Sequence, residues 1–544
     1  MEGARHVRTV SSNVWFKGAF ILTIAALLIK VMSAVYRVPF QNIVGDTGFY
    51  IYQQVYPFYG VVVTLSTYGF PVVISKLYME MKVEGNQTSI EKLVGSFFFL
   101  LFSVSIIAFL VLFSTANTLA EAMKDPQLSL LLRVISFGIL LSPLIATLRG
   151  VFQGDGNMVP TAVSQVGEQT VRVGTILFVA FLFTTTDISL YIVGAGALFG
   201  SITGGITALL ILLYFLKKSK SSFRLFRIPD LSQKETRTLL RKIFFEGITI
   251  SISAMLLILL QLADSLNLYS LLLENGIKEE TAKVMKGVYD RGQPLIQIGT
   301  IISTSMALSI VPLITSNKLK DNKQELIKNI RLSLVVSYFI GLGATVGLIG
   351  IIEQTNSMLF ENTDGSDVLA MLCFIIVLNA LIVTMIAILQ GLGHALFPAI
   401  LIVIGFVIKY WLNKMFVSTY GVNGAAISSL IVLIIIVLFL YAKLRSVLRQ
   451  GIFDYNQVMV ITIAGIFMFI VLKGYMPFSS KILAFIDNNR IKNTIQALTG
   501  VLIGGLIYVF IVLRGNTFKA EELYVLPFGE KLTWFLRKKR REKE

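Results

Sequence analysis

Two cationic side chains, Lys30 and Arg37, lie at the first long apolar stretch of the chain, where charge is costly. They are seven positions apart, which is two helical turns, so both lie on one face of a helix. A Lys or Arg at the centre of a membrane helix costs about 2.5–3.5 kcal/mol and usually faces a bundle interior or a water-filled cavity. The spacing predicts a cationic stripe from mid-membrane to the outer surface. Alternatively, Arg37 snorkels at the helix end and Lys30 pairs with a carboxylate on a neighbouring helix.

Further cations lie inside later apolar stretches. Arg172 follows Glu168 by four positions, the favourable order for an intrahelical ion pair, so the two form a structural pair, contact substrate, or do both. Lys409 takes a place in the second half of the chain similar to that of Arg172 in the first. Arg291 is either a cavity cation or an interfacial anchor.

Two more acids lie in apolar surroundings. Asp264 shares a helix face with Gln261, and it is either the counter-ion of a cation on the first helix, which we prefer, or a proton or sodium site. Asp290 opens a later span beside Arg291. Together with Glu168 these residues are the candidate cavity acids.

Cations predominate among these residues, and guanidinium groups bind phosphate oxygens in a bidentate manner. An anionic substrate, in particular a phosphate, is therefore expected in a cavity lined by Lys30, Arg37, Arg172, Arg291 and Lys409. The segment 48–60, GFYIYQQVYPFYG, adds groups that can stack on and hydrogen-bond sugars, although Tyr is also common in interfacial belts. The candidate sugar contacts are Tyr52, Gln53, Gln54, Tyr56 and Gln261.

The composition is that of an integral membrane protein. The 544 residues are 55% hydrophobic and 15% charged, with a mean hydropathy of +0.77. The single cysteine excludes an intrachain disulfide, and the two histidines give no metal site, so we expect neither metal nor cofactor. The net charge of +17 is concentrated in short loops and at the chain ends, which favours anionic lipid over nucleic acid as the partner.

Apolar runs of membrane-spanning length predict an all-α polytopic protein with fourteen transmembrane helices. Odd connections are acidic and even ones basic, which places both termini in the cytoplasm. The predicted spans are 15–36, 49–75, 93–114, 127–149, 158–184, 187–216, 243–272, 287–316, 330–352, 367–389, 395–416, 421–442, 456–476 and 493–513.

An internal repeat relates the two halves. The motif Gln153-Gly154-x-Gly156 before a proline recurs as Gln390-Gly391-x-Gly393, in the turn between the fourth and fifth spans of each half. Six spans separate the copies, which predicts two six-helix lobes related by a parallel pseudo-two-fold axis. The expected parts are an N-terminal lobe (1–216), a basic cytoplasmic linker (217–242), a C-terminal lobe (243–450), an additional helix pair (451–514) and a basic cytoplasmic tail (515–544) that is either a short interfacial amphipathic helix or disordered.

Enzymatic motifs are absent from the sequence. No GxxxxGK[ST] loop, nucleophile elbow or pair of catalytic carboxylates in a soluble loop occurs. The chain is therefore expected not to be an enzyme.

Four segments carry a resemblance to a known family: IKVMSAVYRVPFQNIVGDTGFYIYQQVYP, STYGFPVVISKLYME, RGVFQGDGNMVPTAVSQVGEQTVRV and ILQGLGHALFPAILIVIGFVIK. In their order and spacing they resemble the multidrug/oligosaccharidyl-lipid/polysaccharide exporter superfamily. Within it they are most similar to the prokaryotic polysaccharide transporters, which include stage V sporulation protein B and Gram-positive lipid II flippases. One departure concerns the first helix, because relatives often have Leu-Gly-Phe where this chain has Met32-Ser33-Ala34, so a bend there is in doubt.

This resemblance implies a flippase of the bacterial plasma membrane. The expected substrate is an undecaprenyl-pyrophosphate-linked saccharide, moved from the inner to the outer leaflet by alternating access, with Lys30 and Arg37 at the pyrophosphate. Envelope-synthesis enzymes are expected partners, and the chain is expected to be a monomer. The alternatives are a sodium- or proton-coupled multidrug exporter and a non-transporting scaffold for envelope assembly.

Overall fold

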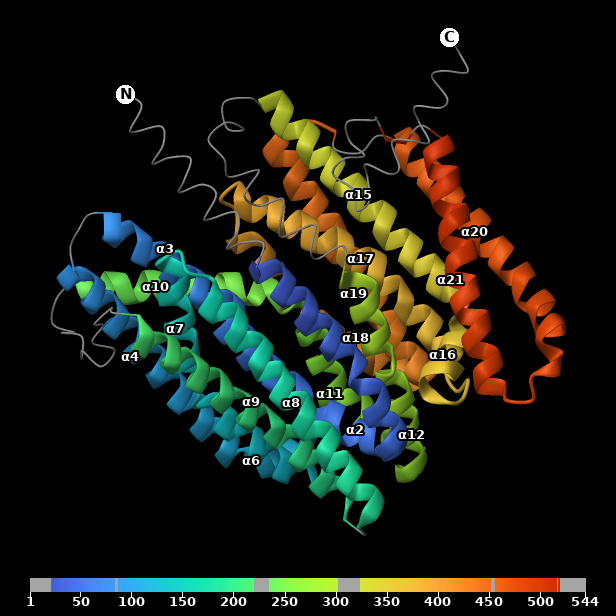
Figure 1. Cartoon of the computed structure of the whole chain (residues 1–544), viewed down its shortest axis with the longest axis horizontal. Coiled ribbons are helices and arrows are strands. Elements are labelled where there is room, and N and C mark those ends of the chain that lie inside the picture. Colours follow the sequence, from blue (N-terminus) through green and yellow to red (C-terminus); the bar gives the residue numbers. More distant parts are fainter. Residues whose placement is uncertain are drawn as a thin grey trace. The chain divides into compact units, whose positions relative to one another are not determined.

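The computed structural model describes residues 21–83, 87–186, 188–219, 234–301, 323–451, 455–515 and 517–518. Within these ranges the chain forms helices and short connections and no β-strand, which confirms the predicted all-α class (Figure 1). Several predicted segments lie partly outside the described residues: 15–20 of the first span, 187 of the sixth span, 220–233 of the basic linker, 302–316 of the eighth span, 452–454 of the additional helix pair, and 516 and 519–544 of the tail.

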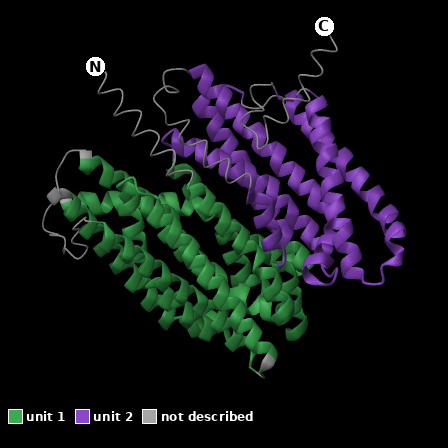
Figure 2. Ribbon diagram, in the orientation of Figure 1, with its two compact units in different colours: residues 1–290, 395–425 green, residues 291–394, 426–544 purple. Residues whose placement is uncertain are grey.

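The chain divides into two compact units (Figure 2). The first unit comprises residues 1–290 and 395–425. Its described elements are the helical residues 21–35, α2 (Arg37–Thr64), a π-helical segment (Leu65–Gly69), α3 (Phe70–Val83), α4 (Gln87–Ser114), α5 (Ala116–Ala122), α6 (Leu128–Ile139), α7 (Ser142–Gly154), α8 (Val159–Thr185), α9 (Leu190–Lys218), α10 (Lys234–Ala254), α11 (Leu256–Glu274), α12 (Glu279–Asp290) and α18 (Leu396–Tyr420).

The second unit comprises residues 291–394 and 426–544. Its core joins α15 to the last two long helices, whose side chains Met468, Leu472 and Tyr508 are buried together. The two predicted lobes follow from a sequence repeat, whereas the two units follow from compactness. The division into lobes therefore stays a prediction. The described elements of this unit are the helical residues 292–301, α15 (Lys323–Gly350), α16 (Ile352–Phe360), α17 (Ser366–Gly391), most of α19 (Val422–Leu448), α20 (Tyr455–Ile482), a 3-10 turn (Leu483–Phe485) and α21 (Asn489–Arg514).

Twelve stretches of the described chain are long and apolar enough to cross a membrane. One of them, Ile21–Lys82, contains the described part of the first predicted span and the whole of the second, and the other eleven each overlap one predicted span. The predicted eighth span extends into residues that the structure does not describe. The multi-pass architecture is therefore confirmed, whereas the count of fourteen stays a prediction.

The helix boundaries differ from the predicted spans at several places, and the predicted fourth span is divided at Leu140 and Leu141 into α6 and α7. The predicted loop between the first two spans is helical, apart from a turn at Tyr36 and a break at Gly45, where φ is 69° and only glycine is unstrained. The predicted seventh span is divided at Met255 into α10 and α11. The hydrophobicity of an apolar run cannot show these helix interruptions, because the run stays apolar across each of them.

The two copies of the repeated turn have the same backbone geometry. Gly156 and Gly393 adopt φ values of 84° and 86°, the left-handed conformation that ends many helices. Their amides donate to the carbonyls of Gln153 (3.1 Å) and Gln390 (3.0 Å). In both turns the next amide donates to a carbonyl five residues earlier. The sequence repeat is thus matched by a repeated local structure, in which Gly391 is the last residue of α17.

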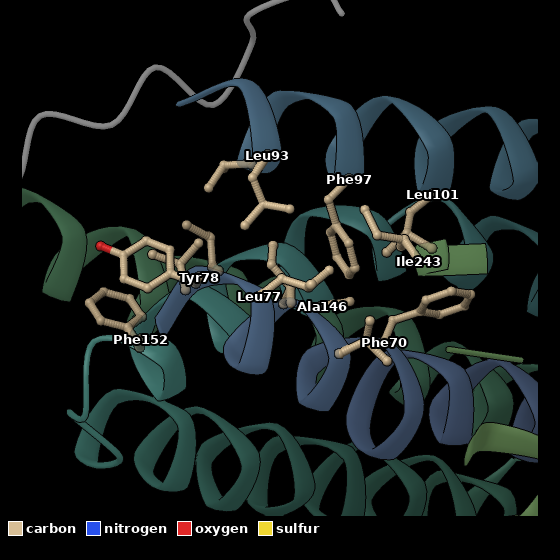
Figure 3. Packing of buried hydrophobic residues seen from close by; sticks show 14 of the residues in the cluster. Phe70, Leu77, Tyr78, Leu93, Phe97, Leu101, Ala146, Phe152 and Ile243 are labelled. Atoms are coloured by element: carbon tan, nitrogen blue, oxygen red, sulfur yellow. The ribbon is translucent and has the colours of Figure 1, made fainter. Parts of the chain in front are cut away.

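Side chains of α3, α4 and α7 pack together in the apolar core of the first unit (Figure 3). Glycines hold α7 close to α3 there. A Cβ at Gly150 would lie 1.7 Å from Cγ2 of Ile74, and one at Gly154 would lie 2.8 Å from the Tyr78 side chain. These glycines are four residues apart on one helix face, the small-xxx-small pattern that allows close packing of membrane helices. The same helix carries Arg149 into the polar site described below.

We expect Gly150→Ala to destabilise the protein by about 1–3 kcal/mol, because the branched Ile74 side chain cannot move away without a backbone shift. The measurement is thermal unfolding of the purified protein in detergent. Gly174→Ala in α8 is the matched control, since no atom lies within 4 Å of its added Cβ, and it should leave the midpoint unchanged or slightly raised. Equal midpoints for both variants would contradict this account of the α3–α7 contact.

Candidate functional site

Arg37 is a buried cation without an anionic partner among the described residues. Its exposed fraction is 0%, and its three guanidinium nitrogens make no hydrogen bond to any described group. Its contacts are aromatic, because the guanidinium carbon lies 4.8 Å from the ring centre of Tyr56 and 5.6 Å from that of Tyr36. A buried charge of this kind is costly unless something compensates it.

Lys30 lies two turns before Arg37 and is half-buried. The turn at Tyr36 barely interrupts the helix, since the Tyr36 amide still donates to the Met32 carbonyl (3.1 Å) and the Phe40 amide to the Tyr36 carbonyl (3.1 Å). The helical phase therefore continues from Lys30 to Arg37. The two cations differ in burial, which the spacing alone did not indicate.

Three tyrosines of α2 form a ladder beside Arg37. Tyr52, Tyr56 and Tyr59 follow each other at helical spacing, with ring centres 5.7 Å and 6.3 Å apart. The ladder ends at Arg172 of α8, whose guanidinium carbon lies 4.8 Å from the Tyr59 ring centre. Arg37 and Arg172 therefore contact neighbouring rungs of one aromatic ladder, here called the tyrosine ladder.

Glu168 joins two arginines beside the ladder. It accepts hydrogen bonds from Arg172, one turn later on the same helix, and from Nη2 of Arg149 on α7 at 2.8 Å. The predicted ion pair between Glu168 and Arg172 is therefore present. The side chains are 1% (Arg149), 7% (Arg172) and 13% (Glu168) exposed.

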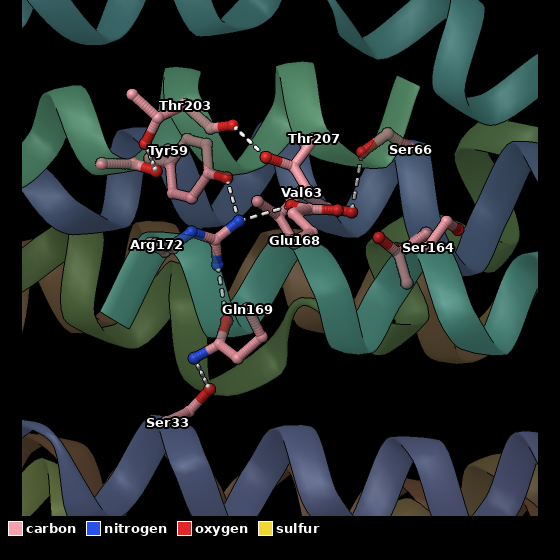
Figure 4. A network of polar contacts seen from close by, with 12 residues as sticks. Ser33, Tyr59, Val63, Ser66, Ser164, Glu168, Gln169, Arg172, Thr203 and Thr207 are labelled. Carbon is pink, nitrogen blue, oxygen red and sulfur yellow. Dashed lines mark hydrogen bonds and ion pairs between the residues drawn. The ribbon is translucent and has the colours of Figure 1, made fainter. Parts of the chain in front are cut away.

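Arg172 also links α8 to the first helix, as Figure 4 shows. It donates to the Tyr59 hydroxyl and, at 2.9 Å, to Oε1 of Gln169. The Gln169 amide in turn donates to Oγ of Ser33 at 3.0 Å, one turn before Arg37. The Nε atom of Arg172 has no hydrogen-bond partner among the described groups.

Sequence reasoning missed Arg149. It donates to Ser164 (3.1 Å) and to Glu168, and it is almost fully buried. The signal was present, because Arg149 is a cation at the end of a predicted span and lies four residues before Gln153 of the repeated turn motif. Only its neighbours in space show that it belongs to the polar cluster.

Asp264 and Lys409 form a second, fully paired cluster. Nζ of Lys409 on α18 lies 2.7 Å from Oδ1 of Asp264 on α11, and the two side chains are 0% and 5% exposed. The same carboxylate accepts from Tyr289 (3.0 Å) and Asn413 (3.0 Å). Asp264 is thus a counter-ion, as preferred, but its cation is on α18 and not on the first helix. The sequence could not identify the partner, because it does not show which helices are neighbours.

Asp290 and Arg291 are adjacent in the sequence but have separate partners. Asp290 pairs with the buried Lys286 one turn earlier at 2.7 Å, a contact within the first unit that sequence reasoning missed. Arg291 belongs to the second unit, where it is fully buried and donates to the side chain of Asn362 at 2.6 Å. Its guanidinium carbon also lies 5.3 Å from the ring centre of Phe360. The role of Arg291 as a cavity cation stays a prediction.

Four of the five candidate sugar contacts are on α2, and Gln261 is on α11. The Tyr52 hydroxyl shares a hydrogen bond of 2.8 Å with that of Tyr36. Gln53 and Gln54 are buried, and the Oε1 atom of each has no hydrogen-bond partner in the described part of the chain. Tyr56 and Gln261 are half-buried. The segment therefore offers open acceptors next to an open cation.

These groups can bind an anion and hydrogen-bond a polar ligand. Within the described residues, no group of three or more His, Cys, Asp or Glu side chains could hold a metal ion. An anion at this position could supply the partner that Arg37 does not find among the described residues.

We expect Lys409→Met to destabilise the protein by about 3 kcal/mol, because it leaves the Asp264 carboxylate buried without its cation. The double variant Lys409→Met/Asp264→Asn should recover most of that loss. Thermal unfolding of the three proteins measures the coupling. Additive losses in the double variant would show that the two groups do not act as a pair.

Similar proteins are known for nearly the whole chain. Residues 15–318 match the polysaccharide biosynthesis protein family. "Uncharacterized membrane protein YabM" of Bacillus subtilis (strain 168) is 40% identical over 532 residues, 97% of each chain. Lipid II flippase MurJ of the same strain is 24% identical over 525 residues, 92% of this chain and 95% of the flippase. A solved structure of lipid II flippase MurJ in an inward closed conformation has a TM-score of 0.65 at 16% identity, covering 90% of this chain and 98% of that one.

The family match covers more than half of the chain, and the 40% identical relative spans almost all of it. The resemblance predicted from the sequence motifs is confirmed by the family match, the flippase relative and its fold. The relative with a named activity is a flippase, which agrees with the prediction of a non-enzymatic protein. The chain therefore belongs to the polysaccharide biosynthesis protein family and has the multi-pass fold of the lipid II flippase structure.

Proposed function

We propose that this protein moves a polyprenyl-pyrophosphate-linked saccharide, such as an undecaprenyl-linked envelope precursor, from the inner to the outer leaflet by alternating access. The observation that carries the proposal is the fully buried guanidinium of Arg37, which has no anionic partner among the described residues. The relative that is a lipid II flippase supports the substrate class.

Phosphate suits the Arg37 environment for two reasons. A guanidinium presents a planar fork that matches two phosphate oxygens, and such charge-assisted bonds are about twice as strong as neutral ones. The aromatic rings of Tyr36 and Tyr56 keep water away from the guanidinium without neutralising it. The pyrophosphate would thus supply the counter-charge, with Lys30 assisting from its less buried position two turns away.

The saccharide would lie against the polar face of α2. Gln53 and Gln54 each have an amide oxygen without a partner, and the tyrosine ladder offers ring faces for stacking. The polyprenyl chain would remain in the lipid. The proposed setting is the bacterial plasma membrane, with both termini cytoplasmic, a monomeric carrier, anionic lipids at the basic loops, and envelope-synthesis enzymes as partners.

Export of a cationic drug is less well supported. Such an exporter would need a carboxylate free to bind the drug or its coupling ion. The three predicted cavity acids, Glu168, Asp264 and Asp290, all form ion pairs with Lys or Arg. Arg37, by contrast, is a buried cation whose guanidinium nitrogens have no hydrogen-bond partner among the described residues.

We expect Arg37→Met to abolish flipping and also to stabilise the empty carrier by about 1–2 kcal/mol, because it removes an uncompensated buried charge. The first effect is measured in liposomes with a fluorescent undecaprenyl-pyrophosphoryl disaccharide and an impermeant quencher. The second is the thermal midpoint without substrate.

Arg133→Met, which replaces an exposed arginine of the same unit, is the control and should flip at the wild-type rate. A lower midpoint together with normal flipping in Arg37→Met would show that Arg37 is a structural residue. A wild-type protein that exports a cationic dye but does not move the lipid would favour the drug-exporter alternative.

Lys30→Ala should slow flipping by about tenfold, an effect of about 1.4 kcal/mol, and Lys30→Arg should restore it. The smaller effect is expected because a half-buried ammonium is partly hydrated. Lys76→Ala, which removes a largely exposed lysine from an ion pair with Glu246, is the matched control for losing one positive charge. Normal flipping in Lys30→Ala would limit the phosphate site to arginines.

A further inference from the structure

We infer that Asp125 is the positioning residue of a latch at the outer end of the first unit, where it fixes two tyrosine rings against which α11 and α12 close. The latch residues are Asp125, Tyr50, Tyr191, Tyr269 and Lys283, here called the aromatic latch. The role of the latch in transport rests on the proposed function, because only a carrier that opens at this end has to release it.

The aromatic latch joins residues from four different connections of the chain. Asp125 lies in the third connection between predicted spans and Lys283 in the seventh. Tyr50 follows the first connection, Tyr191 follows the fifth, and Tyr269 precedes the seventh, each by a few residues. All four are odd connections, which the charge distribution predicts to face outward. The structure brings them together in space, as expected for segments at one membrane surface.

Asp125 is a buried carboxylate that is held by tyrosine hydroxyls. Its exposed fraction is 3%, and no Lys or Arg pairs with it among the described residues. Its Oδ2 atom accepts a hydrogen bond from Tyr50 of α2 at 3.0 Å. The Tyr191 hydroxyl of α9 donates to both carboxylate oxygens, at 2.9 Å and 2.8 Å. One carboxylate therefore fixes the orientation of aromatic rings on two helices.

These two rings are the surfaces that α11 and α12 contact. The Tyr50 ring centre lies 4.9 Å from that of Tyr269 on α11. Nζ of Lys283 on α12 lies 5.5 Å from the Tyr191 ring centre, and it also pairs with Glu279 at 2.6 Å. Asp125 makes neither of these contacts itself. It acts on α11 and α12 through the rings that it orients.

The contacts across the latch are weaker than the hydrogen bonds within it. An aromatic pair or a partly exposed cation–π contact stabilises less than a hydrogen bond to a carboxylate. The Tyr269 hydroxyl is also buried without a hydrogen-bond partner among the described groups, which disfavours the closed arrangement. The latch therefore opens between Tyr50 and Tyr269 and between Tyr191 and Lys283, while Asp125 keeps both rings in place for the next closure.

The two stacked tyrosines provide a matched pair of variants. Tyr50→Phe removes a hydroxyl that donates to Asp125, whereas Tyr269→Phe removes a hydroxyl that has no partner in the described part of the chain. Each variant keeps an aromatic ring of the same size in the stack. If Asp125 acts by orienting the Tyr50 ring, only Tyr50→Phe loosens the latch.

Opening is measured as the rate at which a membrane-impermeant maleimide, added outside right-side-out vesicles, labels Ser270→Cys. Ser270 follows Tyr269 on α11 and is 8% exposed, so its labelling rate reports the open fraction. The single native cysteine, Cys373, is replaced by alanine in this background. Glu280→Cys, at an exposed position of α12, gives the rate at an accessible site and checks that this end faces outward.

We expect Asp125→Asn to label about tenfold faster than the wild-type latch, because hydrogen bonds to a charged group are lost at two tyrosines. Tyr50→Phe should label several times faster, and Tyr269→Phe should label at the wild-type rate. Tyr50→Phe provides the test if Asp125→Asn does not fold. In a separate Asp125→Asn chain that keeps Cys373, this buried thiol of α17 should stay as slow to label as in the wild type, because the latch opens locally.

Equal labelling rates in folded Asp125→Asn and the wild type would overturn the inference, as would equal acceleration by Tyr50→Phe and Tyr269→Phe. Parallel acceleration at Cys373 would also overturn it, because Asp125 would then support overall stability and not the latch. If the labelling rates are as expected but the wild type does not flip the fluorescent lipid, the proposed function fails and the latch stands. The two failures are therefore distinguishable.

Discussion

The buried guanidinium of Arg37 is the constraint on which the proposed mechanism depends. A cation enclosed by Tyr36 and Tyr56, with no hydrogen bond to a described group, lowers the stability of the empty protein and favours the arrival of an anion. Binding energy that relieves such a cost is available only to a ligand of the right charge. Recognition and instability therefore have the same physical origin at this residue, and a substitution that stabilises the protein is expected to disable it.

The other buried charges show how the fold separates structure from recognition. Asp264 and Lys409 satisfy each other across α11 and α18, which joins helices that are distant in sequence. The cluster of Glu168 with Arg149 and Arg172 instead has two cations for one anion, and it lies beside the tyrosine ladder of α2. Arg172 follows Gln153 of the first repeated turn by the same number of residues as Lys409 follows Gln390 of the second. Arg172 nevertheless lies in a cluster with excess positive charge, whereas Lys409 lies in a neutral ion pair. The repeat thus places a cation at equivalent positions, and the neighbouring helices decide what each cation does.

Close helix packing positions this chemistry. Gly150 and Gly154 bring α7 against α3, and the same turn of α7 directs Arg149 toward Glu168 on α8. The break at Gly45 requires a positive φ value, so it depends on glycine as well. This chain does not have the Leu-Gly-Phe motif of the relatives. Its first helical stretch is nevertheless interrupted, by a turn at Tyr36 and a break at Gly45.

The sequence by itself determined the class of protein, the approximate spans, the repeated glycine turns and the ion pair of Glu168 with Arg172. All of these follow from hydrophobicity, local spacing or the need for glycine at positive φ, which are properties of short segments. Only the tertiary structure decided that Lys409 is the partner of Asp264, that Arg149 belongs to the polar cluster, and that Arg37 is buried without a hydrogen-bond partner in the described part of the chain. The physical reason is that electrostatic pairing depends on distance in space, and a sequence of similar apolar helices does not show which faces of those helices meet.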